Sequence, residues 1–283
     1  MNMVTRRIDF FDMHKIADSG QAFRIRDIDG THTELVAFGK YLQVADLGNS
    51  EFAFSCDEKD FISIWEDYFD LSRDYVSIAR SVDSKDKYLK EAAGFSTGIR
   101  ILKQEPFETT ISYIISQRRS IPSITTSVER ISALCGKKIP APKLKAPFVK
   151  PLKDEYYAFP SPAELSSLSP EDIEGTGVGY RAPYIVQAAE GFNDGLLDPN
   201  ALSKLDDEAL YKALMAMFGV GTKVANCVML FAYARTARFP VDVWIQRIVD
   251  RYYNGCFDCS KYPETAGIMQ QFMFYYERRR DSF

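Results

Sequence analysis

Lys223 and Asp242 are the two residues in this sequence whose types and surroundings best suit catalysis. Lys223 directly follows the turn 219–222 (GVGT), and Asp242 lies in the segment 239–243 (FPVDV). A neutral lysine amine is a nucleophile that forms Schiff bases, and a carboxylate can stabilise positive charge or transfer protons. The simpler alternatives are a lysine that only contacts a phosphate and an aspartate that only caps a helix.

The lysine can act as a nucleophile only when its amine is neutral. From a reference pKa near 10.4, neutrality at pH 7 costs about 4.6 kcal/mol. Burial against apolar side chains disfavours the ammonium form and lowers that cost. Val224, Cys227 and Val228 follow Lys223 closely and can supply such a wall.

A helical hairpin must position the lysine. Residues 206–218 (DDEALYKALMAMF) have an amphipathic helical pattern that stops at Gly219, and a second helix is expected from Thr222, which could cap it. Gly219 and Gly221 allow a backbone path that a β-carbon would obstruct. The free amide groups and the positive end of the second helix would form a phosphate-binding site. A bare Gly-x-Gly could equally be an ordinary tight turn.

The aspartate also lies where a helix is expected to begin. Asp242 follows Pro240 and precedes the helical pattern of residues 243–248 (VWIQRI), so it is a suitable N-cap. A capping role is compatible with catalysis, because the cap holds the carboxylate at one place.

The composition predicts a globular protein of about two domains. The 283 residues carry 35 Lys+Arg against 39 Asp+Glu, a net charge of −4, and 46% are hydrophobic, which excludes wholesale disorder. No stretch approaches the ~18 apolar residues of a spanning helix. Asp9 and Asp12 interrupt any apolar stretch of a secretory signal. We therefore expect a soluble cytoplasmic protein, nucleoid-associated in a bacterium or nuclear in a eukaryote.

The cysteines do not indicate a disulfide scaffold or a metal centre. Five are scattered along the chain, and only Cys256 and Cys259 form a C-x-x-C pair. A zinc site needs two more ligands, and the two histidines, His14 and His32, are far away in the sequence. We expect structural or incidental thiols.

The chain begins with β patterns and continues with helices. Alternating apolar residues predict strands over 31–38, 41–44 and 51–56. Apolar residues at helical spacing then follow Asp57, a suitable N-cap. From about residue 105 the pattern is helical, and Pro106 fits a first helical turn.

These patterns predict an α+β protein with two domains. Residues 1–104 would form a β-rich mixed N-terminal domain, and residues 105–283 a predominantly helical domain with the active cleft. Residues 137–160 contain five prolines and six lysines. We interpret this segment as an irregular loop inserted between helices, with a domain linker as the alternative.

Several motifs together resemble one enzyme family. The string 218–225 (FGVGTKVA) resembles the helix-hairpin-helix element of DNA-repair glycosylases, and 239–243 resembles their Pro-Val-Asp segment. Within that superfamily the chain most resembles the 8-oxoguanine DNA glycosylase/lyases. Four further segments resemble motifs of this family in the expected order: 19–24 (SGQAFR), 104–116 (QEPFETTISYIIS), 177–182 (GVGYRA) and 267–274 (GIMQQFMF).

The resemblance implies base-excision repair by flipping 8-oxoguanine out of duplex DNA. Lys223 would form a Schiff base at the sugar C1′, with β-elimination as an associated lyase step, and Asp242 would stabilise the positive charge. The Gly20 carbonyl would accept the N7 proton that distinguishes 8-oxoguanine from guanine. The base pocket implied in this way comprises Gly20, Cys227, Phe231, Pro240, Gln270 and Phe274.

The resemblance also implies how DNA would be held. The DNA contacts implied are those of Arg118, Tyr180, Arg181, Gly219, Gly221, Val224 and Trp244, with Tyr180 as the wedge in the duplex. The partner is double-stranded DNA containing 8-oxoguanine; we expect a monomer, no membrane association and no required cofactor. A structural monovalent or divalent cation is compatible with the hairpin, held by the carbonyls of Met215, Met217 and Val220.

One segment departs from the family pattern. Eukaryotic members have an asparagine run followed by an arginine that helps to read the cytosine opposite the lesion, whereas residues 117–123 here are QRRSIPS. Arg118 could fill part of the gap, but Ser123 is too short for a bidentate contact with a base. We predict weak discrimination among opposite bases. Trp244 replaces a common histidine, which leaves the phosphate contact there open.

Two other functions fit parts of the sequence. A glycosylase for alkylated purines on the same scaffold would use Asp242 with water and would not need Lys223. A non-catalytic helix-hairpin-helix module would bind damaged and undamaged DNA alike.

Overall fold

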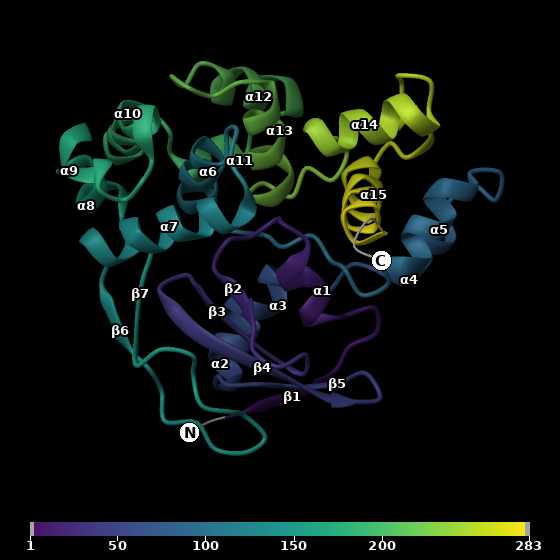
Figure 1. Cartoon of the computed structure of the whole chain (residues 1–283), viewed down its shortest axis with the longest axis horizontal. Coiled ribbons are helices and arrows are strands. Elements are labelled where there is room, and N and C mark those ends of the chain that lie inside the picture. Colours follow the sequence, from purple (N-terminus) through teal and green to yellow (C-terminus); the bar gives the residue numbers. More distant parts are fainter. Residues whose placement is uncertain (1–2, 281–283) are drawn as a thin grey trace.

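The computed structural model describes residues 3–280, which form a five-stranded sheet, a small two-stranded sheet and many helices. Figure 1 shows the sheet on one side of the molecule, with the helices arranged over it. The predicted α+β class is confirmed. No helix in this part of the chain is both long enough and apolar enough to span a bilayer.

The sheet has five antiparallel strands in the order β1-β5-β4-β3-β2. The strands are β1 Val4–Arg7, β2 Ile25–Asp27, β3 His32–Ala37, β4 Lys40–Gly48 and β5 Glu51–Phe54. The three predicted strands are confirmed as β3, β4 and β5. The sequence analysis missed β1 and β2, because such short strands carry too little alternation to be recognised.

One face of the sheet is covered by apolar residues of the segment after β5. Asp57 accepts a hydrogen bond from the amide of Asp60 at 2.8 Å, so the predicted cap is confirmed. The segment continues as α2 Glu58–Asp60, a π-helical turn Phe61–Trp65 and α3 Glu66–Tyr68. With the preceding helix α1 Met13–Asp18, it buries aromatic rings against the sheet.

The remaining helices share a second apolar core. They are α4 Tyr75–Arg80, α5 Lys87–Phe95, α6 Pro106–Ile115, α7 Ile121–Cys135, α8 Pro162–Ser166, α9 Pro170–Glu174, α10 Ala182–Asn193, α11 Pro199–Ser203, α12 Asp207–Met215, α13 Thr222–Phe231, α14 Val243–Tyr252 and α15 Ala266–Arg280. Although α4 and α5 precede residue 104, they belong to this core: the ring of Tyr88 stacks on Tyr252 at 3.9 Å and its hydroxyl bonds Glu277. The boundary at residue 104 stays a prediction.

The lysine-rich segment 137–160 is a strap inserted between α7 and α8, as predicted, but it is not wholly irregular. Its ends pair as the antiparallel strands β6 Lys138–Pro140 and β7 Glu155–Tyr157. Between them the chain crosses the other face of the sheet, where Phe148 packs on Ala45 and Ala53. The strap therefore covers the side of the sheet that faces away from the aromatic core.

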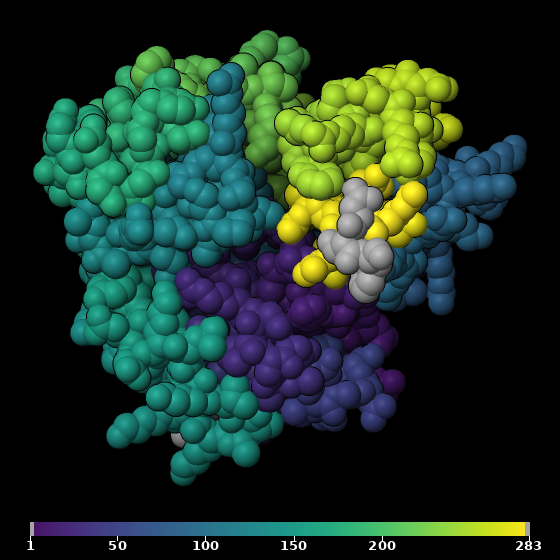
Figure 2. Space-filling model, in the orientation of Figure 1, coloured from purple at the N-terminus to yellow at the C-terminus, as the bar shows by residue number. Residues whose placement is uncertain are grey.

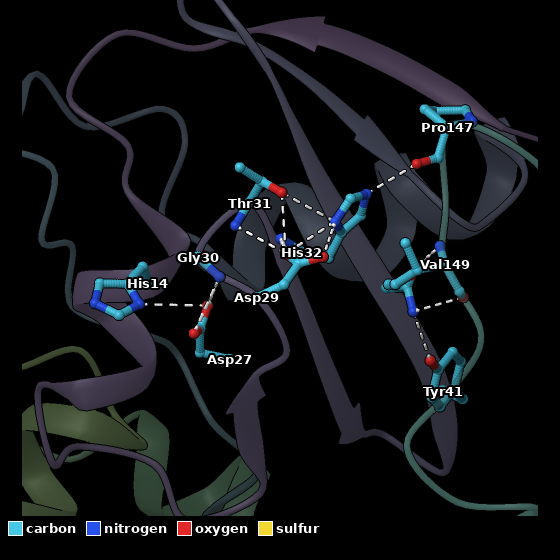
Figure 3. Close-up of polar contacts among 10 residues, drawn as sticks. His14, Asp27, Asp29, Gly30, Thr31, His32, Tyr41, Pro147 and Val149 are labelled. Atoms are coloured by element: carbon cyan, nitrogen blue, oxygen red, sulfur yellow. Dashed lines mark hydrogen bonds and ion pairs between the residues drawn. The ribbon is translucent and has the colours of Figure 1, made fainter.

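Polar contacts also fasten the strap to the sheet (Figure 3). The Nε2 atom of His32 lies 2.9 Å from the carbonyl oxygen of Pro147, and its Nδ1 atom lies 2.9 Å from Asp29. The amide of Val149 donates to the side chain of Gln43 at 2.8 Å. The contacts of Pro147 with His32 and of Val149 with Gln43 each join residues more than a hundred positions apart.

Candidate active site

The helical hairpin predicted around the lysine is formed by α12 and α13. Gly219 has a φ of +80°, and a β-carbon there would lie 2.5 Å from the ring of Tyr184, so this position requires glycine. Gly221 has an ordinary φ of −103°, and a β-carbon there would have no protein atom within 4 Å. The fold therefore requires glycine at position 219, whereas no contact within the described residues explains the glycine at position 221.

The start of α13 differs from the sequence expectation. Gly221 occupies the N-cap, and within the described chain no side chain caps the helix. The expectation that Thr222 is the cap is wrong: Thr222 is the first helical residue, and its hydroxyl pairs with that of Tyr211 at 3.1 Å. The first amide groups of α13 are therefore left for an external acceptor.

Lys223 points from this helix start towards α6. Its Nζ atom donates to Ser116 Oγ at 3.1 Å, and Ser116 Oγ donates onward to the carbonyl of Tyr113 at 2.8 Å. The Nζ atom also lies 4.8 Å from the centre of the Tyr113 ring. That ring stacks on Phe231 at 5.6 Å, so the amine rests on a buried aromatic surface.

The next turn of α13 supplies an uncharged wall. Cys227 is buried, and burial raises the pKa of its thiol to about 11, although the nearby charge of Lys223 opposes that shift. The negative charge of Asp242 adds to the rise, which places this carboxylate close to the same group. At neutral pH Cys227 is therefore a protonated, mostly apolar neighbour.

Asp242 caps α14, as predicted. Its Oδ1 atom accepts a hydrogen bond from the amide of Ile245 at 2.8 Å. The carboxylate is partly exposed, so the second oxygen remains accessible from the cavity that it lines together with Lys223. The cap fixes its position without removing its capacity to act on a bound molecule.

A cavity of about 1070 Å³ joins these groups. Figure 2 shows the surface hollowed between the segment at the α6–α7 turn and α14. Among the residues that the sequence analysis proposed for the site, those lining the cavity are Gly20, Arg118, Gly221, Lys223, Val224, Asp242, Trp244 and Phe274. Residues from both ends of the chain thus meet at one opening.

The part of the cavity next to α15 is narrow. Gly20 has a φ of +75°, and a β-carbon there would lie 3.1 Å from the ring of Phe274 and 3.0 Å from Ile121. Only a residue without a side chain allows the loop to approach the ring this closely, and Gly20 and Phe274 together border a narrow slot of the cavity.

Four other proposed base-pocket residues are buried behind this cavity and do not line it: Cys227, Phe231, Pro240 and Gln270. The side-chain amide of Gln270 donates to the carbonyl of Pro240 at 3.2 Å, and its oxygen accepts from Gln271 at 3.1 Å. Gln270 must exchange these partners before it can contact a ligand.

Two arginines connect the loops beside the opening. Arg181, only 6% exposed, donates to the carbonyl of Gln117, and Arg119 donates to the carbonyl of Gly177 at 2.5 Å. Between them, the exposed residue Arg118 has a φ of +55°, an unusual conformation for a side chain with a β-carbon. In this structure Arg181 holds a loop instead of facing outward, and its DNA contact stays a prediction.

Tyr180 and Trp244 are placed at the surface near these loops. Tyr180 is 58% exposed, and the guanidinium of Arg181 lies 4.3 Å from the centre of its ring. Trp244 lines the cavity beneath Arg247, whose guanidinium carbon lies 5.7 Å from the ring centre. At the hairpin, the carbonyl of Met217, a proposed cation ligand, accepts from the amide of Val220 at 3.1 Å.

Comparison with known protein families agrees with this geometry. Residues 3–110 match the family model "8-oxoguanine DNA glycosylase, N-terminal domain", and residues 111–265 match the "HhH-GPD superfamily base excision DNA repair protein" model. A probable N-glycosylase/DNA lyase of Methanothermobacter thermautotrophicus is 30% identical over 240 residues, 75% of this chain and 73% of that protein. The chain belongs to the 8-oxoguanine DNA glycosylase/lyase family.

Solved structures of similar proteins cover nearly the whole of this family member. The 8-oxoguanine glycosylase/lyase of Clostridium acetobutylicum, bound to DNA containing cytosine opposite 8-oxoG, has 32% identity and a TM-score of 0.90, covering 99% and 96% of the two chains. MBOgg1 with a low-affinity DNA ligand has 35% identity and the same TM-score, covering 99% and 97%. A 3-methyladenine DNA-glycosylase of Archaeoglobus fulgidus, at 15% identity and a TM-score of 0.76, shares the fold.

The site of this glycosylase family member contains residues that the sequence analysis did not assign. The additional lining residues include Tyr113, Ser116, Gln117, Arg119, Gln246, Arg247 and Arg278. Tyr113 and Ser116 belong to a segment recognised as a family motif, so the sequence contained a signal for them. Arg247 and Arg278 lie on helices with many charged residues, where nothing in the sequence singles them out.

Proposed function

We propose that this protein excises 8-oxoguanine from duplex DNA with Lys223 as the nucleophile and then cleaves the strand by β-elimination. The proposal is carried by one observation: the Lys223 amine lies 3.1 Å from Ser116, in a cavity also lined by Asp242. The similar enzymes are named N-glycosylase/DNA lyases, which supports the two-step reaction.

The amine and the carboxylate would share the chemistry at the sugar. The neutral amine of Lys223 forms a bond to C1′, and the electron pair of the glycosidic bond leaves with the base, which takes up a proton. Asp242 stabilises the positive charge that develops on the sugar. The C1′–O4′ bond then opens, the amine loses a proton and O4′ gains one, which leaves an iminium at C1′. The iminium acidifies the C2′ proton, and removal of that proton expels the 3′ phosphate.

Base recognition would combine stacking with one hydrogen bond. We propose that the base inserts against the ring of Phe274 on one side and Cys227 on the other, after a flip that costs a few kcal/mol. The Gly20 carbonyl accepts the N7 proton of 8-oxoguanine, whereas guanine presents a lone pair there. Gln270 would release Pro240 to bond the Watson–Crick edge, with Phe231 and Pro240 completing the pocket.

The hairpin would hold the DNA backbone. Gly221 has open space where a β-carbon would be, and the amides of α13 have no side-chain cap, so a phosphate can approach closely. Gly219 and Val224 would contact the same strand. The remaining proposed contacts are those of Arg118, Trp244, the wedge Tyr180 and, after a change of its present bonds, Arg181.

We also propose that the base opposite the lesion is read only weakly. Ser123 cannot reach a base, and its hydroxyl is bonded to Arg119 at 2.9 Å. Excision rates measured with C, A, G and T opposite the lesion should differ by less than about tenfold. A strong cytosine preference would overturn this part of the proposal.

No cofactor is required for this reaction, but hairpin carbonyls could hold a structural cation. Carbonyl oxygens suit hard cations. Of the proposed set, Met215, Met217 and Val220, the Met217 carbonyl uses one of its two lone pairs for the Val220 amide and keeps the other. Melting temperatures in potassium, sodium and magnesium salts at equal ionic strength test this; equal values would exclude a cation site.

Trapping with borohydride tests the central proposal. Wild-type protein incubated with 8-oxoguanine duplex and borohydride should form a covalent adduct, which Lys223→Gln should abolish and Lys90→Gln, at an exposed position of α5, should not. Excision without an adduct, or excision of alkylated purines alone, would favour the water-using alternative. Equal binding of damaged and undamaged DNA without any excision would favour the non-catalytic module.

A further inference from the structure

We propose that Arg278 is a positioning residue for lesion recognition: its guanidinium holds the loop that carries Gly20 at a fixed separation from the ring of Phe274. The inference rests on the proposed function, in which Gly20 and Phe274 contact the flipped base. It concerns how the slot for the base keeps its width, and it assigns Arg278 no contact with the reacting sugar.

Arg278 contacts the ring of Phe274 within α15. Phe274 and Arg278 are four residues apart, so their side chains lie on the same face of the helix. The guanidinium carbon of Arg278 lies 5.4 Å from the centre of the Phe274 ring, within the range of a cation–π contact. Both residues line the cavity. Arg278 is thus in contact with the ring of Phe274.

Arg278 also joins α15 to the segment that follows α1. Arg278 Nη1 donates to the carbonyl of Asp18 at 2.8 Å, and Nη2 lies 3.8 Å from the Asp18 carboxylate. Asp18 is the last residue of α1, two positions before Gly20. The Nη1 atom lies only 3.5 Å from the place where a Gly20 β-carbon would be. One side chain therefore contacts both walls of the slot.

The other side of the same loop is held by the protein core. The side chain of Gln21 donates to the carbonyl of Arg100 and accepts from the amide of Leu102, both at 2.8 Å. Gly20 is thus flanked by one anchor in the core, through Gln21, and one on α15, through Asp18. Removing Arg278 takes away the bond to the Asp18 carbonyl, while Arg279 still holds the Asp18 carboxylate. The main chain next to Gly20 can then shift relative to Phe274 while the core stays intact.

A phosphate contact is the main alternative role for a cavity-lining arginine. The carboxylate of Asp18 already faces Arg278, and it also accepts from Arg279 Nε at 2.6 Å. A phosphate would have to compete with this carboxylate and with the ring of Phe274. The side chain is also only 22% exposed, so the geometry favours positioning over phosphate binding.

A positioning role and a phosphate-binding role of Arg278 predict different losses of DNA affinity. If Arg278 positions the base slot, its removal impairs only DNA that places a base in the slot. If it binds a phosphate, its removal weakens binding to every duplex by a similar factor. Duplexes with 8-oxoguanine, with guanine, and with a tetrahydrofuran abasic analogue separate these cases.

The experiment uses Arg278→Met, which keeps the length of the stem, and Arg280→Met as the control, because Arg280 lies in the same helix and bonds Tyr252. Binding is measured in a Lys223→Gln background. We expect Arg278→Met to reduce the preference for 8-oxoguanine over guanine by about tenfold, because the Gly20 carbonyl and the Phe274 ring lose their fixed relative position. Affinity for the abasic analogue and cleavage of abasic duplex with Lys223 present should stay within about twofold.

An unchanged preference, or an equal loss on all three duplexes, would overturn the inference. Arg278→Lys keeps a charge for Asp18 but lacks the planar guanidinium, so the preference for 8-oxoguanine should fall in the same direction but by less. If Arg278→Met does not fold, Arg278→Lys replaces it in the experiment. Failure of the proposed function is separate, because it appears in the otherwise wild-type protein as the absence of excision and of a borohydride adduct.

Discussion

The hydroxyl of Ser116 accepts a hydrogen bond from the amine of Lys223 at 3.1 Å and donates one to the carbonyl of Tyr113 at 2.8 Å. The serine oxygen therefore presents a lone pair to the lysine, which fixes the direction of the amine above the Tyr113 ring. Two helices that are far apart in the sequence, α6 and α13, thus position this amine between them.

Loss of this contact should slow the reaction without unfolding the protein. For Ser116→Ala we expect the rate of borohydride trapping to fall by about threefold to tenfold, since a single hydrogen bond contributes about 0.5–1.5 kcal/mol. Single-turnover trapping measures it, with Ser63→Ala at an exposed helical position as the control. A rate equal to that of the wild type would show that the serine does not direct the amine.

Asp242 allows capping and catalysis to be separated. Asparagine caps helices as well as aspartate does, so Asp242→Asn should leave the free energy of unfolding within about 0.5 kcal/mol, whereas Asp242→Ala should lose about 1 kcal/mol. Both should lower excision by about a hundredfold, because both remove the charge. Urea unfolding and single-turnover excision measure the two effects. Full activity of Asp242→Asn would show that Asp242 acts only as the N-cap of α14.

Alanine substitutions at the two hairpin glycines should affect different properties of the protein. Gly219→Ala forces a positive φ and a 2.5 Å approach to Tyr184, so we expect a loss of about 2 kcal/mol or more in the free energy of unfolding. Gly221→Ala should leave stability within about 1 kcal/mol, because its backbone suits alanine, but should weaken DNA binding by about tenfold. Thermal unfolding and DNA titration distinguish them. Equal DNA affinity for Gly221→Ala and wild type would contradict the phosphate site.

The paired arginines should hold the two surface loops together. Arg119→Met removes the bonds to Gly177 and Ser123, so amides of both loops, 116–120 and 177–181, should exchange with deuterium faster. Arg80→Met, an exposed arginine of α4, should leave these rates unchanged. Faster exchange confined to residues 116–120 would show that the loops are not coupled.

Glu108 should make the protein less stable as the pH rises. Burial raises the pKa of this carboxyl to about 7, although Arg24 opposes the shift. Between its ordinary value of 4.5 and about 7 the folded state binds more protons than the unfolded chain, so the folded state loses stability as pH increases through that range.

Glu108→Gln removes this dependence. The variant should therefore gain stability relative to wild type as pH rises from 4.5 to 7, and the difference should level off above pH 7. Urea unfolding at pH 5, 6, 7 and 8 measures it, with the exposed Glu190→Gln as the control. A difference that does not vary with pH would contradict the prediction.

Local signals were enough to predict much of this protein. The sequence alone locates the hairpin, the lysine that follows its turn and the aspartate that caps α14. Each of these features depends on a few adjacent residues: the turn glycines, the apolar periodicity of α12 and α13, and Asp242 before α14. The same holds for β3, β4 and β5. Sequence analysis failed for β1, which pairs with the distant strand β5, and for β2, which is only three residues long. It also failed for Thr222, because a shift of one residue in a helix start leaves the periodicity unchanged.

Only the tertiary structure determined which side chains share the cavity. Arg278 reaches Asp18 across 260 positions, and Lys223 reaches Ser116 across 107. No local pattern encodes such a distance, since it follows from how α1, α6, α13 and α15 pack around a common core. The sequence therefore determined the hairpin, the lysine that it presents and the fold class, while packing determined which groups surround the amine and border the slot.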